Sequence, residues 1–185
     1  MKRSNSVPEV NAGSMADIAF LLLMFFLVSS AIPNDKGFNR KLAAKCPPNV
    51  KCSDEIADRN MMRIYINDQN HIMVNENVID ISELKDNTKD FVDNNGDGSC
   101  SYCKGKGLPN ASNNPKEAVL SLQASKQSSY TTFIEVQDEI TKAFFELRQT
   151  YSNNILNKTI ENLSEEEQME LKKAYPFTLS EAQTK

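Results

Sequence analysis

Residues 15–32 read MADIAFLLLMFFLVSSAI, an apolar stretch in which the one charged residue is Asp17. Its uninterrupted apolar part, residues 18–28, would cover about 16 Å as a helix, because an α-helix rises about 1.5 Å per residue. That is about half of the roughly 30 Å hydrocarbon thickness of a bilayer. A helix that spans the membrane therefore runs over residues 12–32, about 31 Å, and carries Asp17 inside the membrane. Pro33 then ends the helix.

The composition is that of an ordinary globular chain with about one domain: 185 residues, 39% of them apolar and 25% charged. This excludes collagen, a wholly disordered chain and a membrane protein with many spans. The net charge is -4 and there is no basic cluster, so we expect no nucleic-acid partner. The sequence has neither a P-loop nor a G-x-S-x-G motif, and we expect no enzyme activity.

The apolar stretch also fits a secretory signal peptide. Lys2 and Arg3 would form its positive region, and the small residues Ser29 and Ala31 would lie at a cleavage site. The mature chain would then be a secreted protein without this segment. Asp17 argues against cleavage, because a discarded peptide has no use for a carboxylate beside its apolar core. The alternative stays open.

A retained helix gives Asp17 a role. Inserting an aspartate at the centre of a membrane helix costs about 2.5 to 3.5 kcal/mol, so such a residue usually faces protein or water. Burial in a low dielectric disfavours the charged form, which lets the group gain and lose a proton. We therefore predict that Asp17 is a proton carrier. A membrane potential of 100 mV would supply about 2.3 kcal/mol for each proton that crosses the membrane. The helical repeat puts it in a stripe that we expect to face a partner, with Gly13, Ser14, Phe20, Leu21, Met24 and Val28.

Residues 11–17 read NAGSMAD, and the apolar run follows directly. This resembles the N-terminal signature of the ExbD/TolR family of biopolymer-transport proteins, in which an asparagine stands six residues before the membrane aspartate. Asn11 and Asp17 match that spacing. Gly13 and Ser14 depart from the family pattern, which commonly has threonine and proline between the two positions.

The resemblance implies a single N-terminal transmembrane α-helix followed by a small α+β periplasmic domain, with a mixed sheet and two main helices. It also implies the bacterial inner membrane, which the chain would cross once, in contact with membrane lipid and with its N-terminus in the cytoplasm. The expected organisation is a cytoplasmic tail over residues 1–11, a transmembrane helix over 12–32, a periplasmic linker over 33–60, an α+β domain over 61–155 with an insertion at 93–114, and a C-terminal extension over 156–185.

The implied function is that of an energy-transducing subunit in a motor driven by the proton-motive force. Two copies of the chain, a homodimer, would place their helices in a pore formed by a pentameric ExbB/TolQ-like membrane protein, and Asp17 would pass protons inward. The periplasmic domain would transmit force to a TonB-like or TolA-like protein for outer-membrane transport. Protons are the coupling ion, and no other cofactor is expected. The alternative is a passive membrane-anchored module whose periplasmic domain binds a ligand.

The pattern beyond residue 60 agrees with a small α+β domain. Residues 63–67 alternate as a half-buried strand does, and residues 72–74 read as its hairpin partner. The sequence further predicts a helix that opens at Asp80, a strand over 118–124, a long helix over 133–151, a helix with a capping box at Ser164, and a short strand over 176–179. The C-terminal part would pack on the domain or on a second copy.

The four cysteines are Cys46, Cys52, Cys100 and Cys103. In an oxidising periplasm an even count indicates two disulfides. Pairing of neighbours is the simplest arrangement, cross-pairing is equally allowed, and a four-cysteine zinc site is the rival. We expect disulfides and no metal. A calcium loop that begins at Asp93 is disfavoured, because its twelfth position is a lysine rather than a glutamate.

Overall fold

The computed structural model describes residues 12–29 and 56–183. Its contacts divide the chain into two units, Met1–Lys51 and Cys52–Lys185. The described part of the first unit is the helix α1 (Ala12–Ser29), which has 18 residues.

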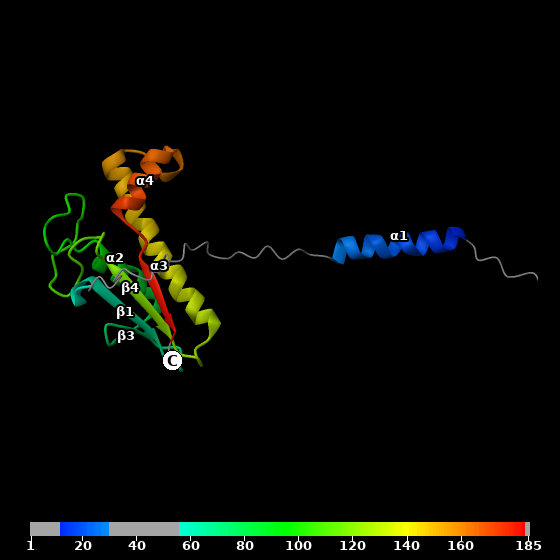
Figure 1. The fold of residues 1–185 in the computed structure, drawn as a ribbon, viewed down its shortest axis with the longest axis horizontal. Helices are drawn as coiled ribbons and strands as arrows, with labels where there is room; N and C mark the ends of the chain where they lie inside the picture. The colour runs from blue at the N-terminus through cyan, green and yellow to red at the C-terminus, as the bar shows by residue number, and fades with distance from the viewer. Residues whose placement is uncertain (1–11, 30–55, 184–185) are drawn as a thin grey trace, which may run out of the picture. The chain divides into compact units, whose positions relative to one another are not determined.

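The second unit is an α+β domain, and Figure 1 shows how its elements follow one another along the chain. Its strands are β1 (Met61–Ile66), β2 (Ile72–Val74), β3 (Asn77–Ile79), β4 (Val119–Ala124) and β5 (Leu179–Gln183). Its α-helices are α2 (Ile81–Val92), α3 (Tyr130–Tyr151) and α4 (Glu165–Ala174). Short helical turns at Asp58–Asn60, Ser152–Leu156 and Ile160–Asn162 complete the described elements.

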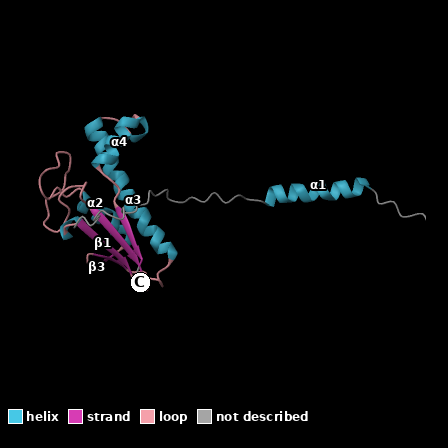
Figure 2. Ribbon diagram, in the orientation of Figure 1, coloured by secondary structure: helices cyan, strands magenta, loops and turns pink. Residues whose placement is uncertain are grey.

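The strands, magenta in Figure 2, form one mixed sheet. Their order is β3-β2-β1-β4-β5. β1, β2 and β3 make an antiparallel meander, with Ile72 opposite both Ile66 and Ile79. β4 runs parallel to β1, and β5 runs parallel to β4 with Leu179 opposite Leu120. Parallel neighbours need crossover connections, and α2 and α3 lie within these two connections.

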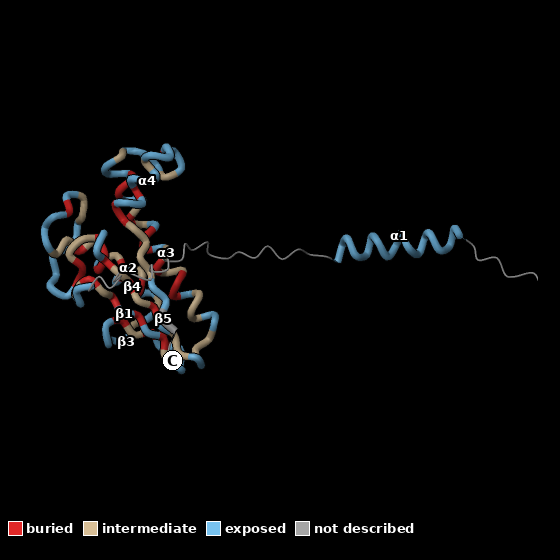
Figure 3. Tube along the Cα trace, in the orientation of Figure 1, coloured by how far each residue is buried: buried red, intermediate tan, exposed pale blue. Residues whose placement is uncertain are grey.

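Both crossovers step across the sheet in the same direction, from β1 to β4 and then to β5. Because such connections are right-handed in nearly all proteins, α2 and α3 lie on the same face of the sheet. Met62, Ile64 and Ile66 of β1 are buried in one core with residues of both helices. The intervening Arg63 and Tyr65 are exposed. Figure 3 shows this alternation, so the sheet has one covered face and one open face.

Most of the predicted elements are present, with shifted ends. The strand expected at residues 63–67 is β1, and the strand expected at 118–124 is β4. The long helix expected at 133–151 is α3, which begins earlier because the Ser129 hydroxyl accepts a hydrogen bond from the Thr132 N–H at 3.1 Å. The capping box predicted at the start of α4 is also present.

Two strands differ from the prediction. β3 is missing from it, because this strand has three residues and follows a turn in which two consecutive non-glycine residues have positive φ. The C-terminal strand, expected from Pro176 on, begins at Leu179. Pro176 has no N–H to donate to a ladder, and Phe177 packs its ring against that of Phe144 on α3, with the ring centroids 4.8 Å apart.

The C-terminal extension expected over residues 156–185 is part of the same fold. Leu163, Leu171 and Tyr175 are buried in the core of the domain. β5 pairs with β4, so the last described residues form an edge of the sheet. The expected boundary at residue 155 is therefore not a boundary between structural units, and this segment packs on the domain of its own chain.

The insertion lobe, residues 93–114, has no helix or strand but is built around a buried asparagine. The Asn94 side chain accepts a hydrogen bond from the Leu108 N–H at 2.6 Å and donates to the carbonyl oxygens of Leu108 and Ser112 at 2.9 and 3.0 Å. The Ser112 hydroxyl donates to the carbonyl of Phe91, near the end of α2, at 2.8 Å. Residues 104–110 are exposed, as expected, while the base of the lobe is fixed to α2.

Candidate functional site: an apolar helix with one carboxylate

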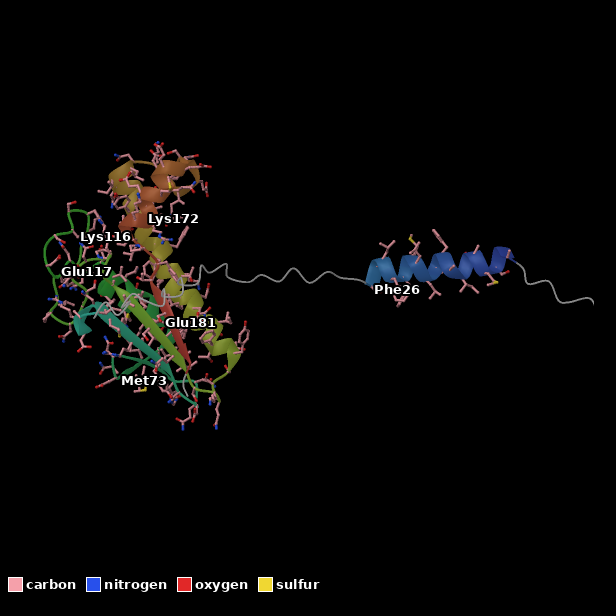
Figure 4. The ribbon with its side chains drawn as sticks, in the orientation of Figure 1. Phe26, Met73, Lys116, Glu117, Lys172 and Glu181 are labelled. Carbon is pink, nitrogen blue, oxygen red and sulfur yellow. A yellow bond between two sulfur atoms is a disulfide. The ribbon has the colours of Figure 1, made fainter. Side chains whose placement is uncertain are left out.

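α1 is apolar on every side. All of its residues are exposed, and Phe25, Phe26 and Leu27 each expose 65% of their surface. Figure 4 shows side chains, with Phe26 labelled among them, that project from opposite sides of the helix. A helix that is hydrophobic all round is stable when a membrane or another protein surrounds it. Among the described residues, α1 is the one helix long and apolar enough to cross a membrane, and its 18 residues rise about 27 Å.

Asp17 provides the one charged side chain of α1. It lies in the second turn, about 8 Å along the axis from the first residue of the helix. With 3.6 residues per turn, the predicted stripe covers a face about 120° wide. The predicted stripe residues therefore lie on the same side of α1 as Asp17; they are Gly13, Ser14, Phe20, Leu21, Met24 and Val28.

Three predicted site residues, Asn11, Cys46 and Cys52, lie outside the described residues. The role of Asn11 in the signature and the pairing of Cys46 with Cys52 stay predictions.

Cys100 and Cys103 are joined by a disulfide. This is the pairing within the C-x-x-C motif, and it occupies both sulfur atoms that cross-pairing or a zinc site would need. Among residues 12–29 and 56–183, no group of three or more His, Cys, Asp or Glu side chains is placed to hold a metal ion. Asp97 belongs to the segment that the sequence pattern disfavours as a calcium loop. Both of its carboxylate oxygens accept hydrogen bonds from Ser99, one from the N–H at 2.9 Å and one from the hydroxyl at 3.0 Å.

Three tyrosines from distant parts of the domain form a cluster that the sequence pattern does not indicate. The ring of Tyr102 lies edge-on to the rings of Tyr151 and Tyr175, with centroids 5.0 and 5.5 Å away. The Tyr102 hydroxyl donates a hydrogen bond to the carbonyl oxygen of Ala174 at 2.9 Å. The Tyr175 hydroxyl donates to Oδ1 of Asp93 at 2.6 Å. The cluster thus joins the insertion lobe to α3 and to the end of α4.

Burial dominates the electrostatics of this cluster. Desolvation raises the pKa of Tyr102 and of Tyr175, and it raises the pKa of Tyr151 to about 12, where a hydrogen bond to Glu170 adds to the effect. The phenols therefore remain protonated at neutral pH and act as donors. Desolvation also raises the pKa of Asp93, against the opposing effect of the hydrogen bond from Tyr175.

Two hollows lie beside the insertion lobe. The larger, about 320 Å³, is lined by Arg59 and Arg63 but also by Asp58 and Glu76. The smaller, about 260 Å³, is lined by three lysines together with two aspartates. Because each mixes basic and acidic side chains, neither presents a single charge to a ligand.

A family model described as biopolymer transport protein ExbD/TolR matches residues 3–149. The match includes α1 with Asp17 and the sheet from β1 to β4, and it covers well over half of the 185 residues. The chain belongs to the ExbD/TolR family. A comparison with curated proteins found no significant match.

Membership in the ExbD/TolR family confirms the resemblance and the expected fold class, since one apolar N-terminal helix precedes a mixed sheet with helices. The family is one of transport proteins, and the N-terminal apolar helix agrees with a membrane-anchored chain. The ExbD/TolR match ends at residue 149, before Tyr151, Tyr175, α4 and β5. The tyrosine cluster therefore combines matched residues with residues beyond the match, which explains why the resemblance gives no signal for it.

Proposed function

We propose that this ExbD/TolR-family protein is a subunit of an inner-membrane motor that converts the proton-motive force into mechanical force for outer-membrane transport. The observation that carries the proposal is Asp17, a single carboxylate in an otherwise apolar helix of spanning length. A charge at this place is costly unless protein or water shelters it, so its presence favours a functional group. An aspartate that alternates between neutral and charged forms responds to the proton gradient.

The helix is retained in this proposal rather than cleaved. The family match starts at residue 3 and runs through α1, which supports a helix that belongs to the working protein. The Cys100–Cys103 disulfide suits an oxidising compartment, which supports a periplasmic domain and a cytoplasmic N-terminus.

In the assembly that we propose, two copies of the chain place α1 inside a pentameric ExbB/TolQ-like protein, with the Asp17 stripe toward the pore wall. Protons are the coupling ion, and the chain itself catalyses no covalent reaction. The periplasmic domain passes force to a TonB-like or TolA-like protein. Small residues at positions 13 and 14 support close packing against a partner helix.

The test is Asp17→Asn, which keeps the shape of the side chain and removes its ionisation. The full chain and its ExbB/TolQ-like partner are reconstituted in proteoliposomes, and proton uptake is measured under an imposed gradient. We expect uptake to fall about a hundredfold or more, as when a positioned proton-transfer group is lost.

Asp17→Glu, which keeps the carboxylate, is the matched variant and is expected to retain more uptake than Asp17→Asn. Normal proton uptake with Asp17→Asn at an equal protein level would rule out the proposed motor function and favour the passive binding module. Sequencing of the N-terminus of the purified mature chain is the second measurement, and a start near Ile32 would show a cleaved signal peptide instead.

A further inference from the structure

The junction between α4 and β5 is held by side chains from two other parts of the domain, the insertion lobe and α3. The Tyr102 hydroxyl donates to the carbonyl of Ala174 at 2.9 Å. The carbonyl of Tyr175 accepts from Nε and Nη2 of Arg148 on α3, at 3.0 and 2.7 Å. The Tyr175 hydroxyl donates to Asp93 at 2.6 Å. We call this set of contacts the junction clamp, and its residues are Asp93, Tyr102, Arg148, Ala174 and Tyr175.

The junction clamp lies just before the start of an edge strand, β5. β5 has β4 as its one neighbour in the sheet, and β5 follows Tyr175 by only three residues. Tyr175 exposes 3% of its surface, so opening the junction would expose an aromatic ring and leave several buried polar groups without partners. Each contact of the clamp therefore opposes the release of the segment from Ala174 to Gln183.

The disulfide bears directly on one of these contacts. Tyr102 stands between Cys100 and Cys103, so the covalent bond closes a short ring around it. A closed ring removes many of the conformations that an open chain could adopt, which keeps the Tyr102 side chain aimed at the junction. Cys100 is buried, whereas Cys103 is partly exposed and is the member that an external thiolate can reach.

We propose that the Cys100–Cys103 disulfide is a redox-sensitive latch, which holds the segment from Ala174 to Gln183 on the domain when oxidised and loosens it when a dithiol reduces it. In the reduction, a thiolate of the dithiol attacks the Cys103 sulfur, the S–S bond breaks, and Cys100 leaves as a thiolate that takes up a proton. The second thiol of the reductant then displaces Cys103, so that the dithiol becomes a disulfide and the protein carries two thiols. Loosening weakens the pairing of β5 and makes the outer edge of β4 accessible.

Hydrogen–deuterium exchange of the full chain in detergent, with and without dithiothreitol, tests the latch. Cys46→Ser and Cys52→Ser are introduced first, so that the reductant acts on the Cys100–Cys103 pair alone. We expect amide exchange in the segment 174–183 to become about tenfold faster on reduction, as for a local opening that has lost part of its constraint. Exchange in β1 is expected to stay unchanged, because this strand is paired on both sides and Met62, Ile64 and Ile66 are buried in the core.

Tyr102→Ala separates the latch from a general effect of the disulfide. In this variant we expect fast exchange in the segment 174–183 already in the oxidised state, with no further increase on reduction. The proposal is overturned if reduction speeds exchange in the insertion lobe but leaves the segment 174–183 unchanged. It is equally overturned if β1 and the segment 174–183 accelerate to the same extent, because the disulfide would then support the whole domain rather than the junction.

Discussion

At the scale of single residues, the surroundings of Asp93 predict how the stability of the domain depends on pH. Desolvation raises its pKa, although the Tyr175 hydroxyl and the Lys104 N–H both donate to it and lower the pKa in turn. A carboxyl group with a raised pKa in the folded state favours folding at low pH. Its contribution is present below its ordinary value of 3.8 and is lost as the pH rises through the raised value.

This predicts the behaviour of Asp93→Asn, which cannot ionise. The free energy of unfolding of the variant, relative to that of the wild type, is expected to increase as the pH rises from 3.8 through the raised pKa of Asp93, because only the wild type acquires a poorly solvated charge. Urea unfolding of the full chain in detergent at several pH values, followed by tyrosine circular dichroism, measures the difference.

Asp97→Asn is the matched control with the opposite sign. Hydrogen bonds from Ser99 lower the pKa of Asp97, so its contribution to stability is lost as the pH falls, and the relative stability of its variant is expected to decrease with rising pH. Parallel pH profiles for the two variants would contradict this assignment of their surroundings.

At the scale of elements, local signals explain what the sequence predicts well. β1 alternates between buried and exposed residues, and α3 carries apolar residues at helical spacing, so both could be predicted from neighbouring positions alone. β3 has two exposed residues out of three and offers no such alternation. The junction clamp joins residues as far apart as Asp93 and Tyr175, and no local pattern reports a contact over that separation. The apolar helix α1, by contrast, could be predicted because its residues form one continuous stretch of the sequence.

The capping box of α4 is a local signal whose strength can be measured. The Ser164 hydroxyl accepts from the Glu167 N–H at 3.3 Å, and the Glu167 carboxylate accepts from the Ser164 N–H at 2.8 Å. Ser164→Ala removes the first bond and is expected to lower the free energy of unfolding by about 1 kcal/mol. Ser82→Ala, at an exposed position inside α2, is expected to change it by less than about 0.5 kcal/mol. Equal effects of the two changes in urea unfolding would show that the cap contributes nothing specific.

At the scale of the whole molecule, the domain does not end where the family match ends. The matched residues supply β1 to β4 and nearly all of α3, while α4 and β5 follow beyond residue 149. Leu163, Leu171 and Tyr175 nevertheless fill the same core as the matched residues. The fold therefore depends on a segment that the resemblance alone would treat as an addition.

Truncation measures that dependence. A chain that stops at residue 155 loses β5, α4 and the buried side chains of that segment, of which Leu163, Leu171 and Tyr175 each contribute roughly 1.5 to 3 kcal/mol by burial. The loss of about 5 kcal/mol or more is comparable with the whole stability of a typical domain. We therefore expect no cooperative thermal unfolding transition and strong aggregation on gel filtration, since the truncation also uncovers the edge of β4. A chain that stops at Gln183 keeps every described element and is the control, expected to unfold like the full chain. A cooperative transition at an unchanged temperature after truncation at residue 155 would show that β1 to β4, α2 and α3 are a complete folding unit without the C-terminal segment.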